Sequence, residues 1–315
     1  METRLVGTLR PQRADGAGTA CRWRGHSVPA VRAPVTRTAV RSVDLPRFET
    51  TRGYAAPVGT SPRDAALALR GLRKSFGTTV AVDDLDLDIP AGSMFGLVGP
   101  NGAGKTTTLS MATGLLVPDA GTVLVHGLDL WARPEQAKRL IGVLPDGLRT
   151  FDRLTGAELI SYAGLLRGMD PGVVRERRDD LLAALDLASA PGVLVADYSA
   201  GMTKKIALAC ALVHAPRLLV LDEPFEAVDP VSAGAIRTIL VRFVEAGGTV
   251  VLSSHVMALV ERMCDHVAVI ASGRVLAVGT LDDVRAGQDL ETRFFGLLGG
   301  PGPEQELSWL RPSSA

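Results

Sequence analysis

A glycine-rich segment from Gly99 to Thr107 constrains the fold of this chain more than any other part of its sequence. It reads Gly-Pro-Asn-Gly-Ala-Gly-Lys-Thr-Thr, follows the apolar run 94–98, and precedes residues that predict a helix. Its glycines allow the backbone to curl so that successive N–H groups point inward, and the positive end of the following helix adds to them. A strand, a tight loop and a helix in this order predict an α/β core with a phosphate-binding loop.

The polar side chains of this segment suit a nucleoside triphosphate bound with Mg²⁺. Lys105 would place an ammonium group on the β- and γ-phosphates, and the Thr106 hydroxyl would coordinate the metal ion. We therefore predict that the chain binds a nucleoside triphosphate. The residues predicted to cradle it here are Gly99, Pro100, Asn101, Gly102, Ala103, Gly104, Lys105, Thr106 and Thr107.

Two adjacent carboxylates follow a second apolar run, residues 218–221. A continuous run of leucine and valine is typical of a parallel strand that is buried on both faces, and ligands bind at the carboxyl ends of such strands. Asp222 would then hold Mg²⁺ together with Thr106, and Glu223 would act on the attacking water. Taken alone, the pair could also be a strand end that solvates a turn, but the phosphate loop favours the metal role.

The segment from Tyr198 to Met202 precedes an amphipathic stretch and predicts another helix start. Ser199 is a good N-cap residue, and the backbone at Gly201 permits close approach of a ligand. With these motifs in this order, the chain resembles the nucleotide-binding subunits of ATP-binding-cassette (ABC) transporters, whose signature is usually LSGGQ. Ala200 and Met202 depart from that signature, whereas Ser199 and Gly201 keep it.

Four further positions between residues 67 and 298 match the family's motif order. By this resemblance Phe76 would stack on adenine, Asp229 would be the acid of the D-loop, and His255 would contact the γ-phosphate. Asp146 stands where the family usually has the glutamine of the Q-loop, and there it would reach Mg²⁺ and the γ-phosphate. Three of these residues have simpler alternative roles. Phe76 could be a core aromatic, Asp229 could only start a helix, and His255 could be a histidine whose hydrogen bonds are satisfied at a strand end.

The resemblance implies an ATPase whose catalytic residues are Glu223, His255 and Lys105. Asp146 keeps another reading open, a cassette that binds ATP but hydrolyses it poorly, because aspartate is shorter than glutamine and cannot donate a hydrogen bond when ionised. Two more classes compete with the transporter subunit. A soluble ABC ATPase acting on ribosomes or DNA usually has paired cassettes or a basic surface, and a phosphate-loop kinase or GTPase lacks the signature segment.

Composition and charge favour the transporter subunit over a nucleic-acid-binding protein. The chain has 34 Lys and Arg against 34 Asp and Glu, so its formal net charge is zero and no nucleic-acid partner is predicted. No apolar run approaches the ~20 residues that cross a bilayer, so the pore is expected on a separate multi-span permease chain. Three cysteines without a C-x-x-C motif fit a reducing compartment. We therefore expect the chain at the cytoplasmic face of the membrane.

The expected organisation is one cassette between two segments of different composition. Residues 1–62 are predicted to be a disordered or wrongly assigned extension, 63–298 the ABC ATPase domain, and 299–315 a short tail. Within the domain we expect a mostly parallel sheet, an antiparallel β-subdomain, and a helical subdomain at about 150–213. In this family the signature helix of one subunit covers the nucleotide bound by another, so a single cassette implies a second copy, expected as a homodimer.

Overall fold

The computed structural model describes residues 65–147, 151, 153–190 and 192–300. All of them belong to one compact unit. The predicted extension at 1–62 and residues 301–315 of the predicted tail lie outside the described residues.

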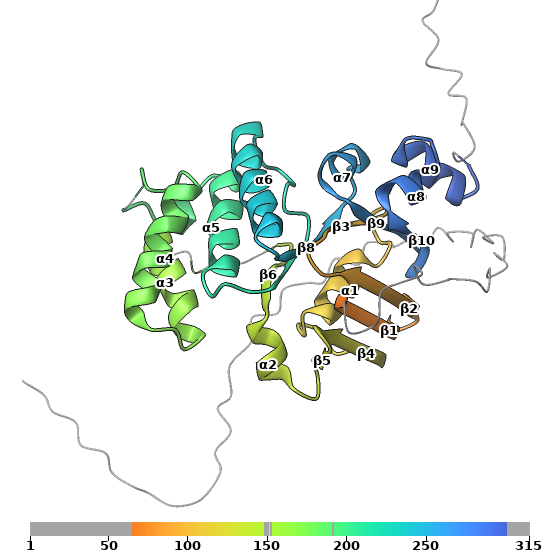
Figure 1. The fold of residues 1–315 in the computed structure, drawn as a ribbon, viewed down its shortest axis with the longest axis horizontal. Coiled ribbons are helices and arrows are strands. Elements are labelled where there is room, and N and C mark those ends of the chain that lie inside the picture. The colour runs from red at the N-terminus through yellow and green to blue at the C-terminus, as the bar shows by residue number, and fades with distance from the viewer. Residues whose placement is uncertain (1–64, 148–150, 152, 191, 301–315) are drawn as a thin grey trace, which may run out of the picture. The chain divides into compact units, whose positions relative to one another are not determined.

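A six-stranded sheet forms the centre of the fold (Figure 1). Five neighbouring strands run parallel, in the order β9-β3-β8-β7-β6, and β10 is added antiparallel at the β9 edge. The mostly parallel sheet predicted from the sequence is confirmed. Its strands are β3 (Met94–Val98), β6 (Ile141–Leu144), β7 (Leu218–Leu221), β8 (Thr249–Ser254), β9 (His266–Ala271) and β10 (Arg274–Thr280).

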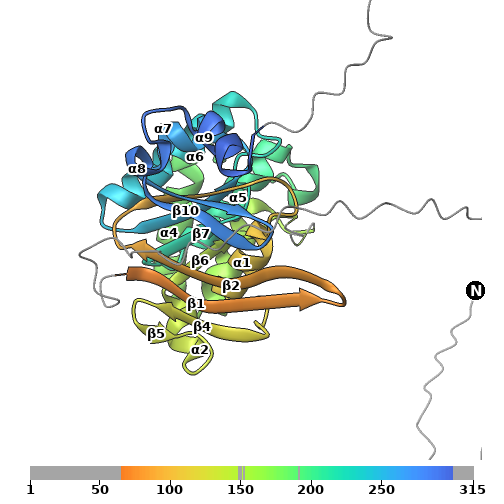
Figure 2. The ribbon, with the colours of Figure 1, turned by 90° about the vertical axis from the view of Figure 1, so that its right-hand side faces the viewer.

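A second sheet has four strands, all paired antiparallel, in the order β2-β1-β4-β5. Helix α1 contacts β1 and β2, and β10 contacts β2, so the two sheets pack on each other in part through α1 (Figure 2). This sheet is the antiparallel β-subdomain expected from the sequence. Its strands are β1 (Ala65–Phe76), β2 (Thr79–Pro90), β4 (Ala120–Val125) and β5 (Leu128–Asp129).

Strand β7 shows why its sequence is apolar at every position. All four of its residues are buried, but they face two different hydrophobic cores. Leu219 and Leu221 pack with helices α5, α6 and α7, whereas Leu218 and Val220 pack with α1 and the four-stranded sheet. Because successive side chains of a strand point to opposite faces, burial of both faces requires a continuous apolar run.

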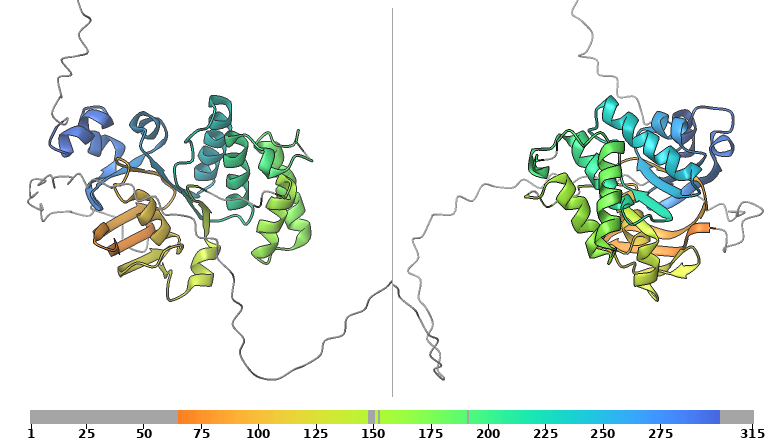
Figure 3. Two further views of the ribbon diagram at one scale, coloured as in Figure 1. Left: turned by 180° about the vertical axis from the view of Figure 1, so that it is seen from behind. Right: turned by 60° about the vertical axis from the view of Figure 1, so that its left-hand side comes forward.

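Helices cover the six-stranded sheet and also form a separate group at one end of it (Figure 3). In that group α3 packs on α4 and α5, and α5 packs on β6, which agrees with the expected helical subdomain. Thr155 and Glu158 form a capping box that starts α3. The helices are α1 (Lys105–Ala112), α2 (Pro134–Arg139), α3 (Gly156–Leu166), α4 (Pro171–Ala184), α5 (Ala200–Leu212), α6 (Pro230–Glu245), α7 (Met257–Met263), α8 (Leu281–Arg285) and α9 (Leu290–Leu297).

Candidate active site

The loop between β3 and α1 leaves the helix start without a side-chain cap. Gly104 is the N-cap residue with φ at 101°, and no side chain caps the helix there. The first N–H groups of α1 are therefore free to bind an anion. Neighbouring backbone leaves no room for side chains, because a Cβ would collide with the Ile270 carbonyl oxygen at Gly99 and with that of Ala81 at Gly104.

Lys105 places a buried ammonium group against this loop. Its side chain is 6% exposed, and its Nζ donates to the carbonyl oxygens of Gly99 at 2.8 Å and Pro100 at 3.3 Å. The same Nζ lies 3.8 Å from Glu223 Oε1. A buried cation needs an anionic partner, and Glu223 is one. A phosphate group entering the loop would be a second anionic partner of Lys105.

Asp222 follows β7 directly and is almost fully buried, with 4% of its surface exposed. The Ser253 hydroxyl donates to Asp222 Oδ1 at 2.5 Å. Burial raises the pKa of Asp222, hydrogen bonds with Ser253 and Thr106 lower it, and the charges of Asp146 and Glu223 raise it. A divalent cation against Asp222 would favour the ionised carboxylate, and one hydroxyl with two nearby carboxylates is an oxygen donor set that suits Mg²⁺.

Glu223 occupies a strained turn immediately after Asp222. Its φ is 46°, in the left-handed region, which costs a residue with a side chain about 1–2 kcal/mol. Its Oε2 lies 3.1 Å from His255 Nδ1 and its Oε1 faces Lys105. The turn is held on one side by the Ser253 hydroxyl, which accepts from Glu223 N at 2.8 Å, and on the other by Lys204, whose Nζ donates to Glu223 O at 2.9 Å.

A cavity of about 460 Å³ lies in front of these groups, within the usual range for a small-molecule site. At one side Phe76 ends β1 with 52% of its surface exposed, and Lys74 Nζ lies 5.8 Å from the ring centroid. An exposed ring that lines a cavity is available for stacking, so Phe76 is not the core aromatic that was the alternative. The lining comprises Phe76, Ala81, the loop residues 100–107, Asp146, Glu223, Glu226 and His255.

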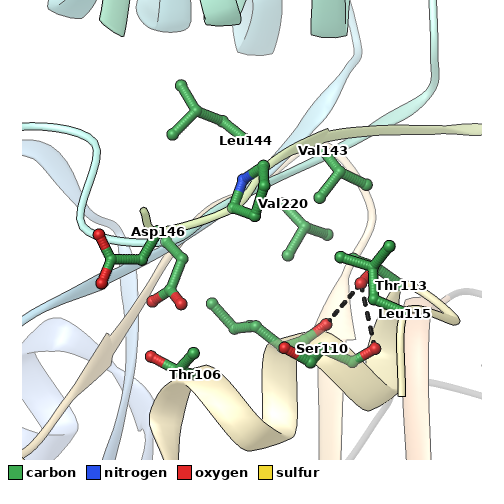
Figure 4. A pocket seen from close by; sticks show the side chains of 11 residues that line it. Thr106, Ser110, Thr113, Leu115, Val143, Leu144, Asp146 and Val220 are labelled. Atoms are coloured by element: carbon green, nitrogen blue, oxygen red, sulfur yellow. Dashed lines mark hydrogen bonds between the residues drawn. The ribbon is translucent and has the colours of Figure 1, made fainter. Parts of the chain in front are cut away.

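Asp146 lies just beyond β6 and also borders a smaller cavity of about 60 Å³. Figure 4 shows Asp146 and Thr106 at one end of that cavity, with Thr113 and Leu115 at the other. The Asp146 side chain is exposed, and its Oδ1 accepts from Gly147 N at 2.8 Å. Asp146 and Thr106 therefore line the same two cavities, and Asp146 has no charged partner among the described ion pairs.

The signature residues form a second cluster that does not line the larger cavity. Ser199 is the exposed N-cap of α5, and its hydroxyl accepts from Met202 N at 3.2 Å. Gly201 is buried, and a Cβ there would lie 2.6 Å from Asp229 Oδ2. Asp229 caps α6, and the hydrogen bond from Ser232 N is the main cause of its lowered pKa. Asp229 thus has the helix-starting role that was its alternative, and Ser199, Gly201 and Asp229 lie together.

Two residues that support the Glu223 turn were not predicted as site residues. Ser253 could have been found from strand register, because β7 and β8 are parallel with Leu221 beside Leu252, which places Ser253 next to Asp222. Lys204 had no such signal, since its contact joins a helix to a turn that is 19 residues away in the sequence. The described residues hold no group of three or more His, Cys, Asp or Glu side chains arranged for a metal ion.

The fold and the site define a phosphate-loop nucleotide-binding protein, and comparisons with known proteins specify the family. A family model described as ABC transporter matches residues 82–226. The daunorubicin/doxorubicin resistance ATP-binding protein DrrA of Streptomyces peucetius is 38% identical over 70% of this chain and 67% of its own length. A Nod factor export ATP-binding protein I of Cupriavidus metallidurans is 39% identical over 68% of this chain and 71% of its own.

A solved structure of an ATP-binding subunit of an ABC transporter superposes with a TM-score of 0.69 at 30% identity, over 74% of this chain and 99% of that one. The chain belongs to the ABC transporter family, as an ATP-binding subunit. Such domains bind ATP, and subunits of this kind work with a membrane partner. None of the helices in the described part of the chain has the length and hydropathy that a membrane crossing requires.

Proposed function

We propose that this chain hydrolyses ATP in the presence of Mg²⁺ and thereby drives the export of a solute through a separate multi-span permease. Support for export comes from its relatives, which are named for drug resistance and for Nod factor export. The cassette would sit at the cytoplasmic face of the membrane, where ATP is available. The same relatives give no support to a role on ribosomes or DNA.

The observation that carries the proposal is the position of the Glu223 carboxylate, between Lys105 and His255 at the mouth of the phosphate loop. The loop and Lys105 would bind the β- and γ-phosphates. Thr106 and Asp222, with Asp146 through a water, would hold Mg²⁺, which when bound neutralises phosphate charge.

Glu223 would accept a hydrogen bond, and then the proton, from the attacking water. His255 would donate to the γ-phosphate from the other side of that water. A histidine suits this position because a neutral imidazole ring donates one hydrogen bond and accepts another.

A complete site would also need a second copy of the chain. Ser199, Gly201 and Asp229 lie together but outside the lining of the cavity that holds Lys105 and Glu223. Within one chain, therefore, the signature segment would not contact a nucleotide bound in that cavity. In a homodimer, the N-terminus of α5 from one subunit would cover the γ-phosphate held by the other, which excludes water and completes the charge clamp.

Replacement of Glu223 by glutamine tests the proposal directly. Glu223→Gln should keep ATP binding but lower turnover by ~10²-fold or more, the scale of losing a general base. Glu245→Gln, at the exposed end of α6, is the matched control and should hydrolyse ATP like the unmodified chain. Steady-state hydrolysis and equilibrium ATP binding, each with Mg²⁺ and with excess chelator, would be measured. Unchanged turnover in Glu223→Gln would remove this residue from the mechanism.

A further inference from the structure

Lys204 contacts the Glu223 turn, and nucleotide binding does not explain this contact. It lies in the second turn of α5, and its Nζ donates to the main-chain oxygen of Glu223 at 2.9 Å. Lys204 is not among the residues that line the nucleotide cavity. Its ammonium therefore acts on the backbone of the proposed base rather than on the ligand.

The turn that Lys204 holds is unusual for a residue with a side chain. Glu223 has a φ of 46°, and such a conformation persists only where its surroundings impose it. The N–H group of Glu223 donates to Ser253, and its carbonyl oxygen accepts from Lys204 and, at 3.2 Å, from Glu226 N. Of the two groups that donate to this carbonyl oxygen, the Lys204 ammonium is charged and the Glu226 main-chain N–H is not, and a charged donor makes a stronger hydrogen bond. Both peptide groups next to the strained residue are thus held.

We propose that Lys204 is a positioning residue for ATP hydrolysis, fixing the Glu223 turn so that its carboxylate points at the attacking water. The inference rests on the proposed function, in which Glu223 is the base. It also ties the base to α5, the helix whose N-terminus carries Ser199. An α5 that moves when Ser199 meets a partner's nucleotide would carry the Glu223 turn with it. Lys204 therefore affects the rate of the chemical step and leaves the phosphate loop as it is.

The test compares two substitutions of Lys204 with a matched lysine elsewhere in the full chain. Lys204→Met keeps the length of the side chain and removes its charge, while Lys204→Arg keeps a charged donor. Lys138 is the control, because its Nζ also donates to a main-chain oxygen, that of Gly114 at 3.2 Å, outside the nucleotide cavity. For each variant kcat, KM for ATP, equilibrium ATP binding and Tm would be measured.

Lys204→Met should lower kcat by about tenfold, the loss expected for one charge-assisted hydrogen bond, with ATP affinity within about twofold of the unmodified chain. Lys204→Arg should recover most of the lost rate. Lys138→Met should leave kcat unchanged and change Tm about as much as Lys204→Met does. A fall in kcat and in ATP affinity together, or no rescue by arginine, would assign Lys204 a merely structural role and overturn the proposal.

A second arm separates this proposal from the function on which it rests. In a Glu223→Gln background, Lys204→Met should have no further effect on the residual rate, because no carboxylate remains to be positioned. An additive loss there would overturn the positioning role. If Glu223→Gln itself hydrolyses ATP normally, the proposed function fails. If Glu223→Gln is slow but Lys204→Met matches the Lys138 control, the positioning proposal alone fails.

Discussion

The phosphate-loop side and the signature side of this cassette differ in how far the chain itself completes them. Around the loop, Glu223 lies close to both Lys105 and His255, and Ser253 connects Asp222 to the same turn. On the signature side, the hydroxyl of Ser199 meets the N–H group of its own helix and faces outward. The side chains of the first region are thus linked to one another, whereas Ser199 contacts only the start of its own helix.

Burial explains the difference between the two regions. Lys105 and Asp222 lie almost fully inside the protein, and buried charges persist only with partners, so their network must form within the folded chain. Ser199 is exposed and caps its own helix, so it needs no further partner within the chain. The buried network thus favours binding of the nucleotide by one chain, and the exposure of Ser199 leaves it accessible to a second copy.

Lys105→Ala should give the largest effect that distinguishes the two regions. Loss of its charge-assisted hydrogen bonds to the phosphates should weaken ATP binding by about 10²-fold. Ser199→Asn keeps a neutral N-cap residue in the signature segment, so it should leave equilibrium ATP binding to the isolated chain unchanged. Binding would be measured by titration with nucleotide. An equal loss of ATP affinity in both variants would contradict the view that the phosphate-loop side binds the nucleotide and the signature side does not.

Asp146→Asn should have a smaller effect that concerns the metal ion rather than the nucleotide. The substitution removes one of the two carboxylates that line a cavity with Thr106, so the Mg²⁺ concentration for half-maximal hydrolysis should rise about threefold to tenfold, with ATP affinity less affected. The measurement is ATPase rate against Mg²⁺ for both forms, with and without the permease. Identical curves in every condition would make Asp146 an ordinary loop residue. A very slow unmodified chain would instead favour the hydrolysis-poor cassette.

The smallest expected effect lies at the far end of α5, where His214 Nε2 faces the Ile141 carbonyl oxygen at 3.0 Å. Burial, together with the nearby charge of Arg167, lowers the pKa of His214 from 6.5 to about 4. Between these values the unfolded chain binds a proton that the folded chain does not, so stability is complete above pH 6.5 and falls as the pH drops toward 4. His214→Gln should flatten this loss between about pH 6.5 and 5, as measured by Tm. An unchanged slope would assign the loss to other groups.

The sequence predicted the architecture and the phosphate-loop site, because both depend on local patterns. The Gly99–Thr107 segment and the apolar run before Asp222 each identify a strand together with the functional residues after it, and parallel strands bring their carboxyl ends together. The left-handed turn at Glu223 and the contact from Lys204 could not be predicted in this way. They depend on how α5 packs on the sheet at β6, which no short pattern encodes. The packing of Gly201 against Asp229 in the same chain is likewise a tertiary result.

A mixing experiment tests the central claim, that a complete site takes its phosphate loop from one chain and its signature segment from another. Ser199→Asp keeps a good N-cap but places a negative charge where the partner's γ-phosphate would approach, so it should bind ATP without hydrolysing it. Lys105→Ala should also be inactive alone.

Mixed in equal amounts, these two variants should recover about a quarter of the unmodified rate, since half of the dimers would be mixed and each would hold one intact site of two. Ser199→Asn mixed with Lys105→Ala serves as the control for the neutral cap. No recovery from folded, associating chains, or full activity of Ser199→Asp alone, would contradict the shared site.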